Sequence, residues 1–415
     1  MKLEIHVLQN FAPSNLNRDD TGAPKDCELG GYRRARISSQ CQKRAVRQSF
    51  VLDKLLAKDD LGARTKRLVA TVATMLAEQH GRDRAHALAV VMGALEGVGL
   101  GKSKKGGEGD DAWKTEYLLF LPQRTLTDLT TLLNSHWDEL SALVAPEESD
   151  DSADEAVDAS GKKAKKAKSD KKKEKSAAKS AYPKEVGVEV NRLLEHARGA
   201  VDVALFGRMM ADKPEWNVDA ACQVAHALST NRVQMDFDFF TAVDDLKPND
   251  NAGSDMMGTV QFNSSCFYRY AVLDVDALKR NLGADEALMK RAVQSFVQAF
   301  VVAIPTGKQN GTAAHNFPSY VLAVVRESGP SLSLANAFLK PARPSIKGGE
   351  EMDLVDDSIA KLEGYAARLS DVTGDALRLA WADRDLAGDP SAPTRAKTPS
   401  ELYQRVTERA LGATP

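Results

Sequence analysis

Residues 30–52 read GGYRRARISSQCQKRAVRQSFVL, a glycine pair followed by a dense basic run. No Asp or Glu lies between Leu29 and Leu52, so the run contains no acidic residue that could neutralise it. Ser39, with Gln42 three positions later, matches the capping-box pattern of a helix start. The stretch therefore predicts a turn, a short strand and then a helix.

The predicted helix has two unlike faces when its residues are placed at helical period. The inward face carries small and apolar residues: Cys41, Ala45, Val46, Ser49, Phe50 and Leu52. The outward face carries cations and amides: Gln40, Lys43, Arg44 and Arg47. The helix start adds free N–H groups and a positive dipole end beside Arg34 and Arg36, which favours a bound phosphate. A polyanion partner is therefore predicted, and solvated surface charge is the alternative.

The composition of the whole chain limits the possible functions. Its 415 residues are enough for two or three structural units, and the net charge of −2 means that nucleic-acid binding must come from local patches. The four cysteines are isolated, which indicates a reducing cytoplasm and predicts no metal site: Cys27, Cys41, Cys222 and Cys266. Residues 1–7 alternate like a strand, with Leu3, Ile5 and Val7 on one face, and lack a signal-peptide core. No run is long enough to cross a membrane.

Gly101-Lys102-Ser103 resembles the end of a phosphate-cradling loop. Glu96 stands where the first glycine of that loop should be, and a helical pattern precedes the segment instead of a strand. No nucleotide cofactor is therefore expected, and the segment is predicted to be a flexible loop.

Residues 147–181 break the globular pattern. Seven acidic residues fall between Glu147 and Asp158, and ten lysines follow between Lys162 and Lys179. Because the segment has almost no aromatic or branched aliphatic residues, it is predicted to be a disordered surface insertion. Contact of its lysines with RNA or a neighbouring subunit is the alternative.

Three further predictions concern the middle of the chain. Residues 201–209 alternate in polarity, which predicts a strand. His226 has no catalytic partner at a recognisable spacing, so it is predicted to be a packed or hydrogen-bonded core residue. Residues 241–270 predict a long hairpin whose tip carries Met256 and Met257. Exposed methionines are costly to solvate, so the tip is predicted to insert between bases or against a neighbouring protomer; folding back on its own domain is the alternative.

Seven short segments occur in one order along the chain: Leu16-Asn17-Arg18-Asp19-Asp20, Lys25-Asp26, Gly30-Gly31, residues 33–40, Lys43-Arg44, residues 240–246 and residues 267–270. Together they resemble the CasC backbone subunit family of Cascade, the type I-E CRISPR surveillance complex. The resemblance runs from residue 3 to about residue 340. The charged insertion and the tail beyond that point depart from it.

The resemblance implies an α+β fold with a palm built on a modified RRM-like, ferredoxin-like sheet. Residues 1–58 would form the N-terminal part of the palm, and residues 183–340 its C-terminal part. Residues 59–182 would form an inserted helical fingers domain that contains the charged insertion. Residues 241–262 would form a thumb β-hairpin, and residues 341–415 a C-terminal helical extension.

The resemblance also implies a cytoplasmic, non-catalytic subunit of a ribonucleoprotein in antiviral defence. Such subunits oligomerise head to tail along CRISPR RNA, and each thumb displaces one base at regular intervals. The RNA between these points stays free to pair with invading target DNA. The implied partners are CRISPR RNA, neighbouring copies of the chain, other Cascade subunits, target DNA through guide pairing and, indirectly, a recruited helicase-nuclease. No membrane partner and no cofactor are expected.

Individual residues receive RNA-binding roles from this resemblance. Contacts with the RNA backbone fall on Arg18, Lys25, Ser38, Gln40, Lys43, Arg44 and Arg47. The wedge at the displaced base falls on Met209, Met256 and Met257. Arg34 and Arg36 join the set through their position at the predicted helix start. Holding a guide without reading its sequence requires cations, hydroxyls and amides on phosphates, and this set supplies them.

Two alternatives stay open. Asp19 and Asp20, beside Asp244 and Asp245, would make a metal-dependent ribonuclease centre if their carboxylates converged. Against this, the type I-E relatives are non-catalytic, and Asp19 has ordinary uses in a turn or in an ion pair with Arg18. No catalytic residue is therefore predicted. A generic single-stranded RNA-binding module is the second alternative. Whether the chain polymerises only on RNA distinguishes this module from a backbone subunit.

Overall fold

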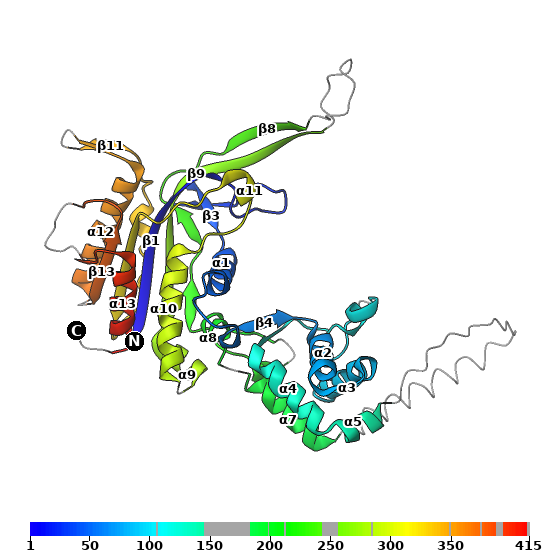
Figure 1. Ribbon diagram of the computed structural model, residues 1–415. Coiled ribbons are helices and arrows are strands. Elements are labelled where there is room, and N and C mark those ends of the chain that lie inside the picture. The colour runs from blue at the N-terminus through cyan, green and yellow to red at the C-terminus, as the bar shows by residue number, and fades with distance from the viewer. Residues whose placement is uncertain are drawn as a thin grey trace, which may run out of the picture. The chain divides into compact units, whose positions relative to one another are not determined.

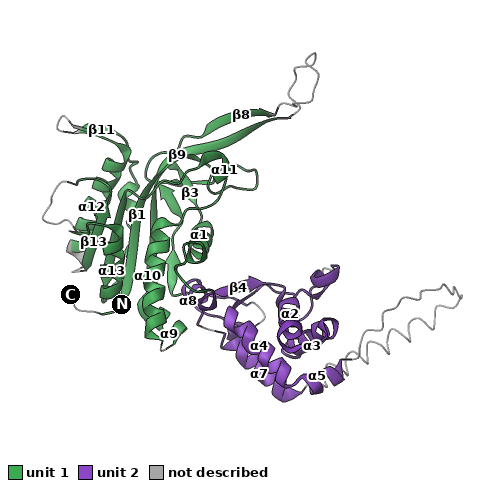
Figure 2. Ribbon diagram, viewed as in Figure 1, with its two compact units in different colours: residues 1–57, 220–415 green, residues 58–219 purple. Residues whose placement is uncertain are grey.

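The computed structural model describes residues 1–415 except 105–106, 145–182, 198, 211–212, 243–255, 284, 348–349, 374–375, 387–392 and 413–415. The described residues form two compact units (Figure 2). Unit 1 comprises residues 1–57 and 220–415, and unit 2 comprises residues 58–219. The predicted charged insertion, Asp244 and Asp245 lie outside the described residues.

Unit 1 is built on a ten-stranded sheet with the strand order β14-β13-β10-β1-β9-β7-β3-β2, and β6 and β8 also pair with β9 (Figure 1). Among its described strands, every pairing is antiparallel except that of β13 with β14. The predicted α+β class is therefore confirmed as a mixed fold with a large, mostly antiparallel sheet. The strands of unit 1 are β1 (Lys2–Ser14), β2 (Asp26–Leu29), β3 (Tyr32–Ile37), β6 (Cys222–Val224), β7 (Ala227–Ser229), β8 (Asp236–Ala242), β9 (Met256–Asp274), β10 (Tyr320–Arg326), β11 (Ser345–Lys347), β12 (Glu350–Met352), β13 (Leu377–Ala382) and β14 (Thr394–Arg395).

β1 lies at the centre of the sheet because it pairs with β10 on one side and with β9 on the other. Leu3, Ile5 and Val7 are fully buried on one face, as their alternation predicts. Glu4 and His6 point to the opposite face and are buried as well. The central strand is therefore enclosed on both sides and not only on its apolar face.

Helices cover both faces of the sheet. α12 (Leu354–Thr373) packs through an apolar cluster on the face that carries Tyr268 and Tyr270. α10 (Glu286–Val302) packs on the other face, where Arg269 donates hydrogen bonds to its last turn. α10 also contacts two further helices, α1 (Ser39–Leu52) and α13 (Pro399–Ala410). The shorter helices of unit 1 are α9 (Val275–Leu282), α11 (Gln309–Thr312) and the 3-10 helix η4 (Ala335–Phe338).

α1 follows β3 directly, as the opening stretch predicts, but Ser38 and not Ser39 is its N-cap. Ser38 has an extended backbone, and its hydroxyl accepts a hydrogen bond from Cys41 N at 3.2 Å. The buried side of the helix is formed by Gln42, Ala45, Val46, Ser49 and Phe50. Leu52, predicted to face inward, is 74% exposed at the end of the helix.

A two-stranded arm projects from this sheet (Figure 1); we define it as β8 with residues 256–262 of β9. Its register runs from Asp236 opposite Phe262 to Ala242 opposite Met256. The rest of β9 continues into the sheet centre, where it pairs with β1. The predicted hairpin thus pairs the short strand β8, which begins at Asp236, with the first residues of the long strand β9.

Unit 2 is mostly helical and has its own apolar core, to which the described helices α2, α3, α4, α5 and α7 contribute residues. It also holds a two-stranded sheet in which Gly62 pairs with Pro122. Its elements are η1 (Lys58–Asp60), β4 (Gly62–Thr65), α2 (Leu68–His80), α3 (Arg84–Gly97), η2 (Gly109–Trp113), β5 (Leu119–Pro122), α4 (Gln123–Ser135), α5 (Trp137–Leu143), α7 (Lys184–Glu195), α8 (Val201–Phe206) and η3 (Pro214–Trp216).

The structure differs from the predicted chain organisation in three places. Unit 2 extends to residue 219 and not to residue 182. Residues 201–206 form the helix α8 where a strand was predicted. All but Phe206 are buried, and Asp202, which produced the apparent alternation, is buried as well and accepts from Gly62 N at 2.7 Å, so polarity does not mark an exposed face here. The tail beyond residue 340 is not only helical, since β13 pairs with β10 and extends the sheet.

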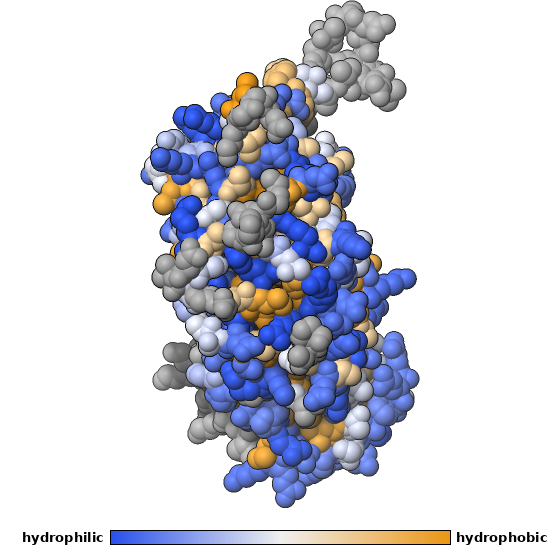
Figure 3. Space-filling view, turned by 90° about the vertical axis from the view of Figure 1, so that its left-hand side faces the viewer, coloured by the Kyte–Doolittle hydropathy of each residue, from blue (hydrophilic) through white to orange (hydrophobic). Residues whose placement is uncertain are grey.

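The face that Figure 3 shows is mostly hydrophilic, and its apolar side chains form small patches instead of one continuous stripe. Over the described ranges, no helix combines the length and the apolar character that a membrane span requires.

Candidate nucleic-acid interface

The loop of residues 15–25 is held against the junction of β3 and α1 by hydrogen bonds. Asn17 accepts at its Oδ1 from Ser38 N at 2.8 Å, and its carbonyl accepts from Lys25 N at 2.9 Å. The Lys25 carbonyl in turn accepts a hydrogen bond from Arg36 N at 2.9 Å. Asn15 ties the loop to the arm, because its Nδ2 donates to the Gln261 carbonyl at 2.9 Å. These hydrogen bonds hold the loop against unit 1 in one conformation.

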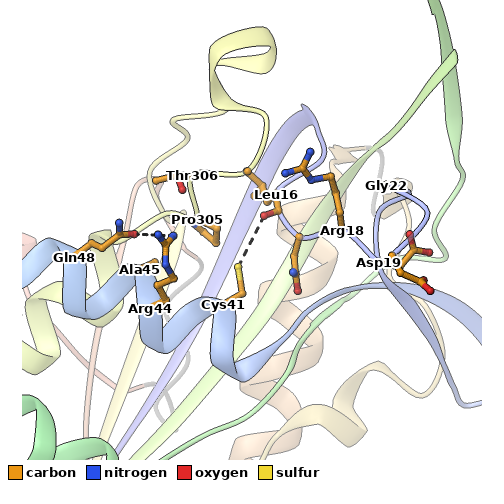
Figure 4. A pocket seen from close by; sticks show the side chains of 13 residues that line it. Leu16, Arg18, Asp19, Gly22, Cys41, Arg44, Ala45, Gln48, Pro305 and Thr306 are labelled. Atoms are coloured by element: carbon orange, nitrogen blue, oxygen red, sulfur yellow. Dashed lines mark hydrogen bonds between the residues drawn. The ribbon is translucent and has the colours of Figure 1, made fainter. Parts of the chain in front are cut away.

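A pocket of about 490 Å³ opens between this loop and α1 (Figure 4). Arg18 enters its lining from the loop and Arg44 from the helix. Pro305, Thr306 and Gly307 form the remaining wall. The structure thus brings two predicted RNA-binding arginines to one concave site.

Gly307 allows the two loops of this pocket to approach each other. A Cβ atom at this position would lie 2.3 Å from the Leu16 carbonyl oxygen. The neighbouring Lys308 has a φ of 53° and Ala313 a φ of 45°, both in the left-handed region that side chains disfavour. Gln309 fixes this conformation, because its Oε1 accepts from Ala314 N at 2.8 Å. The sequence analysis assigned no role to this loop.

Asp19 serves the turn and not an open carboxylate site. Its Oδ1 accepts hydrogen bonds from Thr21 N at 2.9 Å, Thr21 Oγ1 at 2.7 Å and Ala23 N at 3.0 Å. The Thr21 side-chain hydrogen bond is the main cause that lowers the pKa of Asp19. Among the described residues, no three His, Cys, Asp or Glu side chains are placed to hold one metal ion.

The residues that were predicted to contact phosphates differ in their solvent exposure. Arg18, Gln40 and Arg44 are exposed. Four others are partly exposed: Lys25, Arg36, Lys43 and Arg47. Ser38 is only 7% exposed, and its hydroxyl already caps α1. We refer to the six cations Arg18, Lys25, Arg36, Lys43, Arg44 and Arg47 as the basic surface.

The prediction that Arg34 contacts RNA is wrong, because the side chain is fully buried. Its guanidinium donates to the carbonyls of Ser229 at 3.1 Å, Thr230 at 2.6 Å and Phe338 at 2.6 Å. Burial lowers the pKa of Arg34, and the carbonyl oxygens compensate for the lost hydration. Arg34 therefore joins three segments of unit 1 and offers no surface to a ligand.

The prediction that His226 belongs to the core is also corrected. The residue is exposed, and Arg36 Nη1 lies 3.2 Å from its Nδ1. Lys25 is close enough for its charge to act on the imidazole. No sequence pattern could have shown this cluster, because Arg36 and His226 are 190 positions apart.

The arm exposes aromatic side chains that the sequence analysis did not single out. Phe237 and Phe239, two positions apart on one face, are 66% and 64% exposed. Met257 is 66% exposed and pairs with Thr241 on the same face. Phe240, on the other face, covers Gly258, where a Cβ would meet its ring at 2.5 Å. The arm thus has an open face that carries Phe237, Phe239 and Met257, and Phe240 on its other face is less exposed, at 37%.

Of the predicted wedge residues, Met257 lies in the arm and Met209 in unit 2. Met209 is 85% exposed and follows Arg208, which is buried. Arg208 donates to the carbonyls of Leu194 at 3.3 Å and Ala197 at 3.2 Å, at the end of α7. Met256 begins β9. The exposed methionine of unit 2 therefore stands on a rigid, hydrogen-bonded base.

Residues 3–404, nearly the whole chain, match the protein family described as CT1975-like protein. The chain belongs to the CT1975-like family. Among curated proteins, the comparison found no match.

Two solved structures are similar to this CT1975-like chain over almost its full length. A chain of a "CRISPR RNA-guided surveillance complex, pre-nicking" is 30% identical, with a TM-score of 0.78, over 99% of this chain and 100% of the other. A chain of a "CRISPR RNA-guided surveillance complex" is 25% identical, with a TM-score of 0.67 and the same coverage. These matches confirm the predicted relation to the CasC-like backbone proteins of Cascade.

Proposed function

We propose that the chain is a non-catalytic, CRISPR RNA-binding backbone subunit of a type I-E Cascade complex. It holds the guide through its phosphates, oligomerises head to tail along it in the cytoplasm and leaves bases free to pair with invading target DNA. The sheet of unit 1 serves as the RRM-like palm, unit 2 as the fingers and the arm as the thumb.

The observation that carries this proposal is that three cations of the basic surface lack a counter-charge. Among the residues that the structure describes, Arg18, Lys25 and Arg36 have no carboxylate partner. This contrasts with Arg384, which contacts three carboxylates, those of Asp353, Asp356 and Asp383. The chain has 58 acidic residues for 56 basic ones, so pairing would have been available. Cations that stay unpaired beside a helix start suit a polyanion.

The open face of the arm supports the assembly part of the proposal. A two-stranded hairpin gains little stability by itself, and Phe237 and Phe239 are mostly exposed in the single chain. We assign these two rings to contact with the neighbouring copy. Met209, Met256 and Met257 are assigned to the displaced base, where apolar wedges suit an unstacked nucleotide.

The geometry of Asp19 supports the non-catalytic role. Three hydrogen bonds from Thr21 and Ala23 hold Oδ1 of Asp19 in the turn, and the described residues bring no group of three His, Cys, Asp or Glu side chains together for a metal ion. Incubation of the RNA complex with magnesium or manganese tests this assignment. Cleaved RNA would reinstate Asp19 and Asp20 as catalytic candidates.

The RNA-binding proposal is tested with a CRISPR-repeat-bearing RNA across a salt series. The variant Arg18→Ala, Lys25→Ala, Arg44→Ala removes three cations of the basic surface. Because each phosphate contact with a single strand contributes a slope of about −0.7, the log–log salt dependence should flatten by roughly 2 per bound copy. Wild-type protein should coat the RNA in stepwise oligomers and leave it uncut.

A matched control removes the same charge from α9 and α10 through Lys279→Ala, Arg280→Ala and Lys290→Ala, which are exposed. This control should keep the wild-type slope. Equal slopes for the wild type and the first variant would show that the basic surface is misassigned. Binding of single copies without oligomers would favour a generic RNA-binding module.

A further inference from the structure

His226 lies in a cluster of donors that lacks any anion. Arg36 donates through Nε to the Asp26 carbonyl at 3.2 Å and through Nη1 to His226 Nδ1 at 3.2 Å. Lys25 lies beside Arg36, since the Lys25 carbonyl accepts from Arg36 N at 2.9 Å. Its ammonium has no hydrogen-bond or ion-pair partner among the described residues.

The surroundings of His226 supply no carboxylate to balance these cations. The nearest acidic side chain on β2, Asp26, is ion-paired with Arg33. Cys27 on the same strand stays a neutral thiol, because burial raises its pKa. On α1, the charge of Lys43 acts on the Cys222 thiol of β6, and the charges that act on the imidazole itself are those of Arg36 and Lys25. Every charged group near the imidazole is therefore a cation or is already neutralised.

The hydrogen bond from Arg36 defines the state of the free imidazole. A guanidinium can only donate, so Nδ1 must accept and the ring is neutral with its hydrogen on Nε2. Once the ring is protonated, both of its nitrogens donate. Arg36 and His226 then need a common acceptor, and an anion shared by the two groups satisfies both.

We propose that His226, Lys25 and Arg36 together bind one backbone phosphate of the RNA, with the imidazole as a third and protonatable donor. This inference rests on the proposed RNA-binding function and adds a residue that the resemblance did not assign. It also makes the affinity for the guide RNA depend on pH through His226. The other cations of the basic surface add no such dependence.

The direction of this pH dependence follows from linkage. In the free protein, desolvation and then the charges of Arg36 and Lys25 lower the pKa of His226. A bound phosphate neutralises both cations and raises the pKa, so binding takes up a proton. RNA affinity must therefore increase as the pH falls through the pKa of the bound state. Each unit of increase in pKa corresponds to about a tenfold gain in affinity.

The test measures RNA affinity from about pH 8.5 to about pH 6, the range in which histidine titrates, at constant ionic strength. Wild-type affinity should rise several-fold across this range, whereas His226→Gln should remain nearly flat and match the wild type at the alkaline end. His80→Gln, an exposed histidine at the end of α2, is the matched control and should keep the wild-type profile. The buried His6 is present in all three proteins, so its titration cancels in the comparison.

A second readout separates phosphate binding from a merely structural role. The imidazole resonance of His226, assigned by its loss in His226→Gln, should titrate at a higher pH with a short RNA bound. An unchanged pKa, or a His226→Gln profile as steep as that of the wild type, would overturn the inference while RNA binding itself stands. Failure of the wild-type protein to bind RNA at any pH would instead refute the proposed function. If inorganic phosphate alone moved the pKa as far as RNA does, the site would be one for free anions and not for the guide.

Discussion

The two halves of β9 are one continuous strand with opposite surroundings. Residues 256–262 form the arm with β8, and the open face of this arm carries Phe237 and Phe239. From Ser265 onward the strand is enclosed on both faces, up to Leu273. Helices cover this part on each side of the sheet, whereas the described residues place no helix over the arm. The contrast shows that the fold completes its core without the aromatic residues of the arm.

The enclosed half of β9 also contains a buried charged group whose hydrogen bonds are satisfied within the fold. In the enclosed half, Arg269 is 3% exposed and donates to Gln9 Oε1 at 2.6 Å and to the carbonyls of Val301 at 3.3 Å and Ala303 at 3.4 Å. These carbonyls belong to the end of α10, where helical partners are missing. In the arm, Phe237 and Phe239 stay mostly exposed and bury little apolar surface in the single chain. Stability therefore resides in the enclosed half, and the arm is available for binding.

The largest expected effect is on Arg269, whose burial lowers its pKa to about 10. Arg269→Met removes the donors and leaves Gln9 and the α10 carbonyls unsatisfied, so the free energy of unfolding should fall by about 3–5 kcal/mol. Urea unfolding measures this change. Arg33→Met removes an exposed arginine paired with Asp26 and should cost less than about 1 kcal/mol. Equal losses in the two variants would contradict the assignment of stability to the enclosed half.

A smaller effect concerns His6, which stacks on Tyr270 and hydrogen-bonds Tyr268 at 2.9 Å. Burial is the main cause that lowers its pKa, against the opposing hydrogen bond of Glu4. The unfolded chain therefore binds this proton first, and stability should fall as the pH drops below about 6.5, by at most about 1.4 kcal/mol per pH unit. The slope of unfolding free energy against pH should be shallower in His6→Gln. An unchanged slope would show that His6 does not stay neutral in the folded protein.

The smallest effect on stability is expected in the arm. Phe237→Ser with Phe239→Ser should change the free energy of unfolding by no more than about 0.5 kcal/mol, since both rings are mostly exposed. The same variant should lose stepwise assembly on RNA, which sedimentation measures. Ile346→Ser, on the β11–β12 hairpin and 79% exposed, is the control that should assemble normally. A strongly destabilised double variant would mean that the arm belongs to the core.

The sequence predicted elements with a clear period and missed those that depend on distant partners. The alternation of Leu3, Ile5 and Val7 and the start of α1 were readable because they are local. Sequence pattern alone could not separate the buried arginine of the basic run from the exposed ones. Arg34 is buried by segments that lie 195 and 304 positions away in the chain. The pairing of Arg36 with His226 was hidden for the same reason.

The position of β1 has a consequence for synthesis. His6 and its hydrogen-bonded Tyr268 are separated by 262 positions, so the central strand leaves the ribosome long before either neighbour exists. At about 5–20 residues per second, β1 waits roughly 13–50 s with both faces uncovered and both edges unpaired. Unit 2, whose residues 58–219 are contiguous, can form during that interval. The growing chain is therefore a substrate for chaperones that shield the first strand until β9 and β10 arrive.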